Sequence, residues 1–336
     1  MALPVAVPYR SDDADAWNAF VATSRNGTFL FDRRYMDYHA DRFEDASLVF
    51  RDGEGGRILA LLPANRTGDR LVSHGGLTYG GLVLGPDGGS TLVARLFEAL
   101  LAHMVAAGLS VLRYKTVPAI YHRAPAEDDR YALYRLGAVL VRRDLMTAVP
   151  PAAAPAVSHG RRYVLKKLAK RDDVAVGPSD DWAAFWGVLA GRLEDRYATR
   201  PTHDLDEIRL LAGRFPAEIG LRVGRLGGRI AAGLVLYETQ TVVHAQYMAA
   251  NDEARAVGVL DAVVIAAVEE AQAKGKWFDF GISTEADGRF LNEGLAAYKE
   301  SFGGRGVVHD FYELGPAAGI DPGRLANRRA EAPESP

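Results

Sequence analysis

The first candidate for acid–base chemistry in this chain is a histidine at the entrance to a predicted helix. His203 directly precedes Asp204, and the spacing of Asp204 and Glu207 predicts a capping box in which Asp204 is the N-cap. The positive end of a helix dipole disfavours an imidazolium, whereas neighbouring carboxylates favour one, so the net effect on the ring stays open. We predict that His203 acts as a general base or orients the attacking nucleophile. A histidine that only packs at the helix entrance is the alternative.

A carboxylate inside an apolar strand is the second candidate. Asp279 lies in the segment 277–280, whose other residues are aromatic. A buried carboxylate needs a partner, so Asp279 is expected either to form a structural ion pair, for example with Lys299, or to bind substrate. Ser283, Asn292 and Lys299 follow in the loop and helix after this strand. Lys299 could hold a phosphate or an acyl carbonyl, and a solvated lysine is the alternative.

Polar residues also occur in an earlier predicted strand. Alternation along it places His244 and Gln246 on one face with Met248, while Tyr247 points to the other face. Either Gln246 or Tyr247 could contact a ligand, and packing is the alternative for each.

The stretch 73–81 carries His74 and Tyr79 among four glycines. Glycines let a backbone approach a ligand closely, so we predict that His74 and Tyr79 line a substrate site. A structural turn with a satisfied histidine is the alternative.

Composition limits the chemistry that these residues can carry out. The chain has 336 residues, of which 48% are hydrophobic and 25% charged, a globular balance with room for two domains. It contains no cysteine, which excludes disulfides and thiolate nucleophiles and fits a cytoplasmic compartment. Its eight histidines show no paired metal-ligand spacing, so we predict no metal. We expect no signal peptide and no membrane span, and a net charge of −3 argues against a nucleic-acid partner.

The two halves of the chain repeat the same order of signals. Each begins with a helix in which a tryptophan and a phenylalanine lie three residues apart, starting at Trp17 and at Trp182. Each continues with a Gly-Gly hairpin, a third strand, and a helix that ends at a glycine before a short strand. This order predicts an internal duplication. The hairpin glycines are Gly55–Gly56 and Gly227–Gly228, the third strands span 71–79 and 241–249, and the helix-ending glycines are Gly108 and Gly275.

The clearest helix precedes Gly108. Apolar pairs recur every four residues from Leu92 to Val105, with Ser90 as the expected N-cap and Gly108 as the C′ residue. Such helices packed on mostly antiparallel sheets predict an α+β fold. We place the two domains at 1–149 and 159–315, with a proline-rich linker at 150–158 and a tail at 316–336.

The order of three strands, a glycine-led helix and a further strand resembles the core of the GNAT acyltransferases. In that fold the loop that enters the central helix holds the pyrophosphate of coenzyme A with backbone N–H groups. The family pattern is Arg or Gln, two residues, Gly, one residue, Gly or Ala. Arg255 and Gly258 match its first two anchors, and Leu260 departs from the third. The equivalent segment of the first half, 85–90, has no such arginine, so the resemblance implies a coenzyme A site in the second half only.

About residues 14–314 resemble the tandem-GNAT group. This group includes the Fem-type aminoacyltransferases and the acyltransferases of nucleotide-linked amino sugars, and the stretches at 201–203 and 279–303 look nearer to the amino-sugar branch. The resemblance is carried by Ser73–Gly81, Arg200–His203, Gln246–Tyr247, Phe278–Gly281, Leu291–Leu295 and Tyr298–Gly304.

The resemblance implies an acyl-CoA-dependent N-acyltransferase that acts on an amino sugar, linked to a nucleotide, by direct attack of the amine on the thioester. Both halves are then expected to share one fold, with the acceptor in a cleft between them. The implied catalytic residues are His203, Tyr247 and Asp279; the implied coenzyme A contacts are Arg255, Ala256, Gly258, Asn292 and Lys299; and the implied substrate contacts are His74, Tyr79, Gln246 and Ser283.

Two alternatives stay open. One is a Fem-type transferase that moves an amino acid from aminoacyl-tRNA to a peptidoglycan precursor; the other is a repeat that binds a glycan or peptide without catalysis. A basic cluster at 161–171 bears on the first alternative, because helical spacing aligns Arg162, Lys166 and Lys170 in one stripe. The stripe could bind a sugar diphosphate, the 3′-phosphate of coenzyme A or tRNA. The alternative is a helix face that is only solvated.

Overall fold

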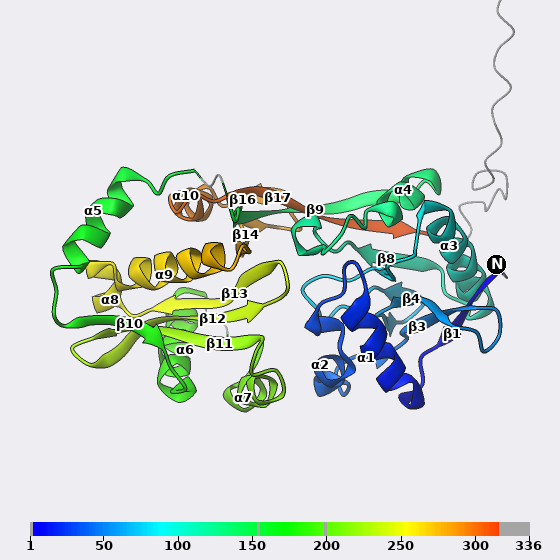
Figure 1. Ribbon diagram of the computed structural model, residues 1–336, viewed down its shortest axis with the longest axis horizontal. Helices are drawn as coiled ribbons and strands as arrows, with labels where there is room; N and C mark the ends of the chain where they lie inside the picture. The colour runs from blue at the N-terminus through cyan, green and yellow to red at the C-terminus, as the bar shows by residue number, and fades with distance from the viewer. Residues whose placement is uncertain (1–2, 153–154, 198–199, 316–336) are drawn as a thin grey trace, which may run out of the picture. The chain divides into compact units, whose positions relative to one another are not determined.

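The computed structural model describes residues 3–152, 155–197 and 200–315, and the chain folds into two compact units (Figure 1). Unit 1 holds Met1–Arg143 together with the chain from His309 onward, and unit 2 holds Asp144–Val308. The chain leaves unit 1 within strand β9 (Val139–Val149) and returns within strand β17 (Arg305–Leu314). Residues 153–154 of the predicted linker and the predicted tail at 316–336 lie outside the described residues.

Unit 1 contains two sets of strands. The first is an antiparallel sheet in the order β1-β3-β4-β7. In the second, β8 pairs in parallel with β6 and antiparallel with the end of β17, while β6, β5 and β2 are joined antiparallel. The strands are β1 (Pro4–Pro8), β2 (Glu44–Asp45), β3 (Leu48–Asp52), β4 (Ile58–Leu62), β5 (Asn65–Thr67), β6 (Arg70–Val72), β7 (Val83–Leu84) and β8 (Val111–Lys115).

The main helix of unit 1 is α3 (Ser90–Ala106), which buries the apolar stripe that the sequence predicted. Gly108 follows it with φ +65, as expected of a C′ glycine. The predicted N-cap was wrong by one residue: Gly89 is the N-cap, and the Ser90 hydroxyl donates to Asp128 at 2.6 Å instead. The other helices are α1 (Ala14–Thr23), α2 (Arg33–Met36) and α4 (Asp128–Arg135).

Unit 2 is built on one twisted sheet in the order β10-β11-β12-β13-β14, followed by the end of β9. All neighbours are antiparallel except β13 and β14, which run parallel. A small hairpin of β15 (Thr284–Glu285) and β16 (Phe290–Leu291) lies after the sheet. The sheet strands are β10 (Val174–Pro178), β11 (Ile219–Leu226), β12 (Arg229–Glu238), β13 (Val242–Ala250) and β14 (Trp277–Ile282).

Helices cover both faces of this sheet (Figure 1). α9 packs on one face, where a Cβ added to Gly224 would lie 2.5 Å from a methyl group of Val259. α6 packs on the other face, where a Cβ added to Gly233 would lie 2.7 Å from the Phe185 ring. Only glycine permits such close approach on each side. The helices are α5 (His159–Leu168), α6 (Trp182–Tyr197), α7 (Leu205–Arg214), α8 (Asp252–Val257), α9 (Val259–Ala273) and α10 (Glu293–Glu300).

The predicted duplication is visible in the order of elements. Each unit runs strand, helix, hairpin, further strands, long helix, glycine and strand, and Gly227 and Gly228 form the β11–β12 turn with φ +57 and +78. The predicted fold class, two α+β domains with mostly antiparallel sheets and flanking helices, is confirmed. One strand differs: the predicted strand at 71–79 is only β6, because the chain leaves the sheet at His74, where φ is +46.

Candidate functional site

The polar residues of unit 2 gather where β13 and β14 separate. The two parallel strands pair from Val242 opposite Trp277 as far as His244 opposite Asp279. Both strands continue beyond this register, but no further pair joins them in the part of the chain that the structure describes. We call the point defined by His244 and Asp279 the fork. The facing edges beyond the fork do not pair with each other, so a ligand can pair with those backbone groups that no side chain already occupies.

A β-bulge in β13 lies just past the fork. Ala245 is opposite Leu236 of β12, and Tyr247 is opposite Val235, so Gln246 is the extra residue. A bulge resets the alternation of side chains along a strand and bends it locally.

The bulge places His244 and Tyr247 on the same face of the sheet. Tyr247 lies on the α6 face, where its ring meets Trp186 edge-to-face with centroids 5.4 Å apart. Both neighbours of His244 belong to the apolar cluster that α9 shares, so His244 points to the α6 face as well. Met248 packs against the α9 cluster. The sequence-based assignment of faces was wrong, because strict alternation cannot register the bulge.

His203 and Tyr247 form a buried hydrogen-bonded pair. The predicted capping box of α7 is present, with Glu207 N–H donating to Asp204 at 2.8 Å, and it holds His203 just before the helix. His203 Nδ1 lies 2.5 Å from the Tyr247 hydroxyl, which also accepts the His203 backbone N–H at 3.2 Å. Burial raises the pKa of Tyr247, while hydrogen bonds from His203, Thr202 and Gln246 oppose that rise. His203 is 4% exposed, so the ring is fixed on the α6 face.

His244 and Asp279 form a second pair at the fork. His244 Nδ1 lies 2.8 Å from Asp279 Oδ2, and the Gly281 N–H donates to the other carboxylate oxygen at 2.7 Å. Asp279 is fully buried and the His244 side chain is 12% exposed. Lys299, suggested as one possible partner of Asp279, interacts with it through its charge, while His244 and the Gly281 N–H contact the carboxylate directly. Sequence reasoning missed His244 as a site residue; the signal available was a histidine and an aspartate on two neighbouring strands.

Lys299 supports the end of β14. It is 2% exposed, and its Nζ donates to the carbonyls of Gly281 at 2.9 Å and Ile282 at 2.5 Å. Burial lowers the pKa of Lys299 to about 8, and the Asp279 charge opposes this effect. The ammonium therefore holds backbone rather than an open phosphate or acyl group.

Ser283 and Asn292 tie the following loop together. Ser283 is 1% exposed, and its hydroxyl lies 3.4 Å from that of Thr147. Asn292 caps α10 by accepting the Leu295 N–H at 3.0 Å and donates to Glu285 at 2.8 Å. These placements give both residues structural roles, so they do not support the predicted ligand contacts.

The predicted pyrophosphate cradle at Arg255–Gly258 lies at the junction of α8 and α9. Gly258 links α8 to α9 with φ +89, and a Cβ added there would collide with a methyl group of Val164 from α5. Its N–H already donates to Ala254 at 2.9 Å. Arg255 is exposed and pairs with Asp252 at 3.3 Å, and Ala256 is exposed beside it. α5 thus packs closely on the side of Gly258 where a Cβ would lie.

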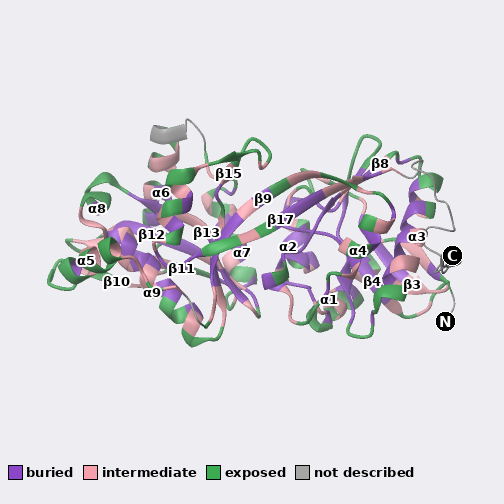
Figure 2. Cartoon of the chain, turned by 90° about the horizontal axis from the view of Figure 1, so that it is seen from above, coloured by how far each residue is buried: buried purple, intermediate pink, exposed green. Residues whose placement is uncertain are grey.

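α5 is anchored over this junction by one arginine. Arg161 pairs with the buried Asp261 of α9, donates to Ser301 at 2.9 Å, and lies over the ring of Tyr298 at 4.5 Å. The rest of the helix is largely exposed (Figure 2), and Arg162 and Lys166 are on its open side. The basic stripe is therefore presented to solvent while Val164 and Leu168 face inward.

In unit 1, His74 is buried and strained. It is 3% exposed with φ +46, its ring stacks on His39 with centroids 5.3 Å apart, and its Nδ1 makes no hydrogen bond in the described part of the chain. Burial lowers the pKa of His74 to about 3, and neighbouring His39 acts in the same direction. That nitrogen is itself buried, so the placement of His74 gives no support to the predicted substrate contact.

Tyr79, the other predicted contact in unit 1, is a core residue. It is 1% exposed, hydrogen-bonds the Thr28 hydroxyl at 2.9 Å, and packs against Phe31 and Tyr121. Its geometry gives no support to a ligand contact.

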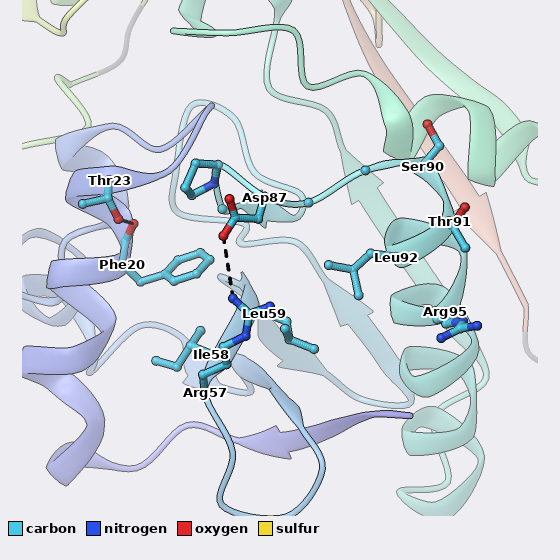
Figure 3. A pocket seen from close by; sticks show the side chains of 14 residues that line it. Phe20, Thr23, Arg57, Ile58, Leu59, Asp87, Ser90, Thr91, Leu92 and Arg95 are labelled. Atoms are coloured by element: carbon cyan, nitrogen blue, oxygen red, sulfur yellow. Dashed lines mark hydrogen bonds and ion pairs between the residues drawn. The ribbon is translucent and has the colours of Figure 1, made fainter. Parts of the chain in front are cut away.

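A pocket of about 720 Å³ lies at the start of α3 in unit 1 (Figure 3). Phe20, Leu59 and Leu92 form part of its wall, and the exposed Arg57 pairs with Asp87 at 3.7 Å. Its place in the duplicated fold corresponds to that of Gly258 at the start of α9. The first half thus has an open pocket at this position, whereas in the second half Val164 packs against Gly258. None of the polar side chains that line it is buried, and we assign it no ligand.

Among the described residues there is no cluster of three or more histidine or acidic side chains arranged to hold a metal ion. In the same residues, no helix is long and apolar enough to cross a membrane.

Comparison with known proteins agrees with the fold of the two units. Residues 158–300 match the family described as an acetyltransferase (GNAT) domain, a segment that contains α5, the fork and α10. No curated protein matches the chain. The domain match and the fold support the prediction that the protein is a transferase enzyme.

Solved structures share the fold over nearly the whole chain. FemX is 12% identical, with a TM-score of 0.64 over 91% of this chain and 96% of its own. The C-terminal domain of a putative lysylphosphatidylglycerol synthetase from Agrobacterium fabrum is 15% identical, with a TM-score of 0.59 over 94% of each chain. L-PGS from Bacillus licheniformis is 14% identical, with a TM-score of 0.56 over 96% of this chain and 98% of its own. At these identities the likeness shows the fold, and it gives no preference for an amino-sugar substrate.

Proposed function

We propose that this protein is an N-acyltransferase that joins an activated acyl group to a primary amine at the fork of unit 2. The observation that carries the proposal is the fork itself, where paired strands separate beyond His244 and Asp279 beside a bulge. Unpaired backbone edges can hold an extended donor, and N–H groups near a bulge can stabilise the oxyanion of a tetrahedral intermediate. The acetyltransferase match covers both strands.

The reaction needs three things from the protein. It must align the amine with the acyl carbon, accept the proton that the amine loses, and stabilise the oxyanion. We assign the alignment of the amine to His203 and Tyr247, because their 2.5 Å contact fixes two polar groups on the α6 face, the face to which His244 points.

Two donors are compatible with this site. Acyl-CoA is the donor that an acetyltransferase domain suggests, with a nucleotide-linked amino sugar as acceptor. Aminoacyl-tRNA, with a peptidoglycan precursor as acceptor, is the second candidate. One observation favours the second: Arg162 and Lys166 on α5 are exposed, so a phosphate backbone can bind there.

A donor comparison tests the proposal. Purified protein is incubated with acetyl-CoA and longer acyl-CoAs together with UDP-linked amino sugars, and separately with charged tRNAs and a peptidoglycan precursor. Mass spectrometry then detects an acceptor that has gained an acyl or aminoacyl group. Complete absence of acyl transfer in both sets, with a protein that melts cooperatively, contradicts the proposal.

Charge reversal on α5 distinguishes the donors. Lys166→Glu together with Lys170→Glu should weaken transfer from aminoacyl-tRNA at least about tenfold, and increasingly so at low salt, because a polyanion loses phosphate contacts. Transfer from acyl-CoA should change less than about twofold, since both lysines are exposed and Val164 is the α5 side chain beside Gly258. Arg229→Glu, an exposed cation in the β11–β12 hairpin, is the matched control.

A further inference from the structure

We infer that His244 is the proton acceptor of the transfer reaction and that Asp279 is the residue that positions it. This inference rests on the proposed function and names groups that the sequence did not assign to these roles. Both residues sit at the last paired register of β13 and β14, so they border the separated edges proposed to hold the donor.

The hydrogen bonds of Asp279 fix the tautomer of His244. The carboxylate accepts from the Gly281 N–H through one oxygen, at 2.7 Å, and faces His244 Nδ1 with the other, at 2.8 Å. An ionised carboxylate only accepts hydrogen bonds, so Nδ1 of a neutral His244 must carry the hydrogen. The lone pair is then on Nε2, the atom that can take a proton.

Packing holds the ring and leaves its edge accessible. Gly281 has φ +72, and a Cβ added to it would lie 3.4 Å from His244 Cε1, so the ring rests against a residue without a side chain. Asp279 is fully buried, whereas the His244 side chain keeps 12% of its surface exposed. No hydrogen bond to Nε2 is present in the described part of the chain, so this nitrogen is available to substrate.

A buried cation interacts with the Asp279 carboxylate. Lys299 donates to the Gly281 carbonyl at 2.9 Å, and its charge interacts with that of Asp279. Asp279 on β14 contacts His244, and the charge of Lys299 on α10 interacts with Asp279. The other titratable groups on this face of the sheet are Tyr247 of β13 and His203, which precedes α7. Attraction between Lys299 and Asp279 favours the ionised carboxylate, and an ionised Asp279 in turn stabilises an imidazolium formed at His244.

A neutral amine attacks the acyl carbon of R–CO–X, where X is the sulfur of a thioester or the oxygen of an ester, and a C–N bond forms. Nε2 takes a proton from that nitrogen. The C–X bond then breaks with its electron pair leaving on X, and the imidazolium returns the proton to X. The products are an amide and H–X, and His244 is neutral again.

Substitutions at the two residues test the assignment. Proton transfer by a positioned side chain contributes about 10²–10⁴-fold, so His244→Gln should lower kcat by at least about a hundredfold with KM changed less than about threefold. The acid limb of the pH–rate profile should disappear. Asp279→Asn should lower kcat by about tenfold or more and alter the same limb, because an amide can hold either tautomer. His159→Gln, at an exposed position of α5, is the matched control and should leave kcat and the profile unchanged.

A second measurement separates failure of the inference from failure of the proposed function. Diethyl pyrocarbonate acylates neutral, accessible imidazole nitrogens, and peptide mass spectrometry locates the product without any substrate. His244 should be modified at Nε2 at least about fivefold faster than the buried His203 in the wild type, and Asp279→Asn should slow that modification. If His244 is modified in this way but the protein transfers no acyl group, the proposed function is wrong, and the assignment of a neutral, accessible imidazole at His244 still holds. If His244→Gln keeps the wild-type kcat and pH–rate profile, the inference is wrong while the proposed function still holds. The same conclusion follows if His244 is not modified by diethyl pyrocarbonate.

Discussion

Val164 of α5 packs against Gly258, the residue that immediately precedes α9. The glycine has φ +89, a conformation that side chains rarely adopt, and it joins α8 to α9 without an intervening loop. The glycine that the sequence suggested as a phosphate cradle therefore serves helix-to-helix packing. Its requirement for glycine is explained by backbone conformation and by the contact with Val164.

Substitution at Gly258 should reveal both contributions. Gly258→Ala places a Cβ in the left-handed region, which costs about 1–2 kcal/mol, and drives it into Val164, which adds about 1–3 kcal/mol. The free energy of unfolding, measured by urea denaturation, should fall by the sum.

Gly275→Ala is the control for the backbone term, because Gly275 has φ +68 and open space around it. The double variant Val164→Ala and Gly258→Ala should recover part of the loss relative to the sum of the single effects. If the two alanine substitutions lower the free energy of unfolding equally, the contact between a Cβ at position 258 and Val164 adds no measurable cost.

Arg161 should be essential for holding α5 in place. Its guanidinium pairs with Asp261, whose side chain is 8% exposed, so Arg161→Ala leaves a nearly buried carboxylate without its cation. The expected loss of unfolding free energy is on the order of 3 kcal/mol, with faster hydrogen exchange throughout α5. Combining Arg161→Met with Asp261→Asn removes both charges and should restore much of the stability. A double variant no more stable than Arg161→Ala would contradict this account.

Local signals predicted most of the fold, because they depend on residues close in the sequence. The Gly-Gly hairpins, the capping box at Asp204, the apolar stripe of α3 and the glycines that end the long helices all occur where expected. Such features are set by backbone conformation and periodicity alone.

The site was harder to predict, because it depends on contacts between distant segments. The pairing of His244 with Asp279 follows from the register of two parallel strands 35 residues apart, and the face of Tyr247 follows from a bulge at Gln246. The packing of Val164 against Gly258 brings together residues 94 positions apart in the sequence (258 − 164 = 94). Motif spacing cannot report these relations, which tertiary packing decides.

Lys115 should make stability depend on pH. It is buried in unit 1, its Nζ donates to the Leu77 carbonyl, and burial lowers its pKa from 10.5 to about 7. A folded-state pKa below the unfolded value means that the unfolded state binds more protons between the two values, so stability should rise as pH increases from about 7 to about 10.5. Urea denaturation at several pH values measures this slope.

Lys115→Met should flatten that dependence and, because it removes a buried ammonium, should not destabilise the protein at pH 7. Lys166→Met, at an exposed position on α5, should leave the slope unchanged. A wild type whose stability does not rise over this range would contradict the assigned effect of burial.

The contact between His203 and Tyr247 should affect acceptor binding more than chemistry. Tyr247→Phe removes the hydroxyl that lies 2.5 Å from His203 Nδ1 while keeping the aromatic contact with Trp186. The ring of His203 then loses the group that orients it, and we expect KM for the amine to rise about tenfold, equivalent to about 1.4 kcal/mol of binding, with kcat lowered less than about threefold. His203→Asn should behave similarly and keep the acid limb of the pH–rate profile. Trp186→Phe, which retains an aromatic ring beside Tyr247, is the control and should leave KM within about twofold. If His203→Asn instead lowers kcat a hundredfold and abolishes the acid limb, then His203 is the proton acceptor and the role assigned to His244 is wrong.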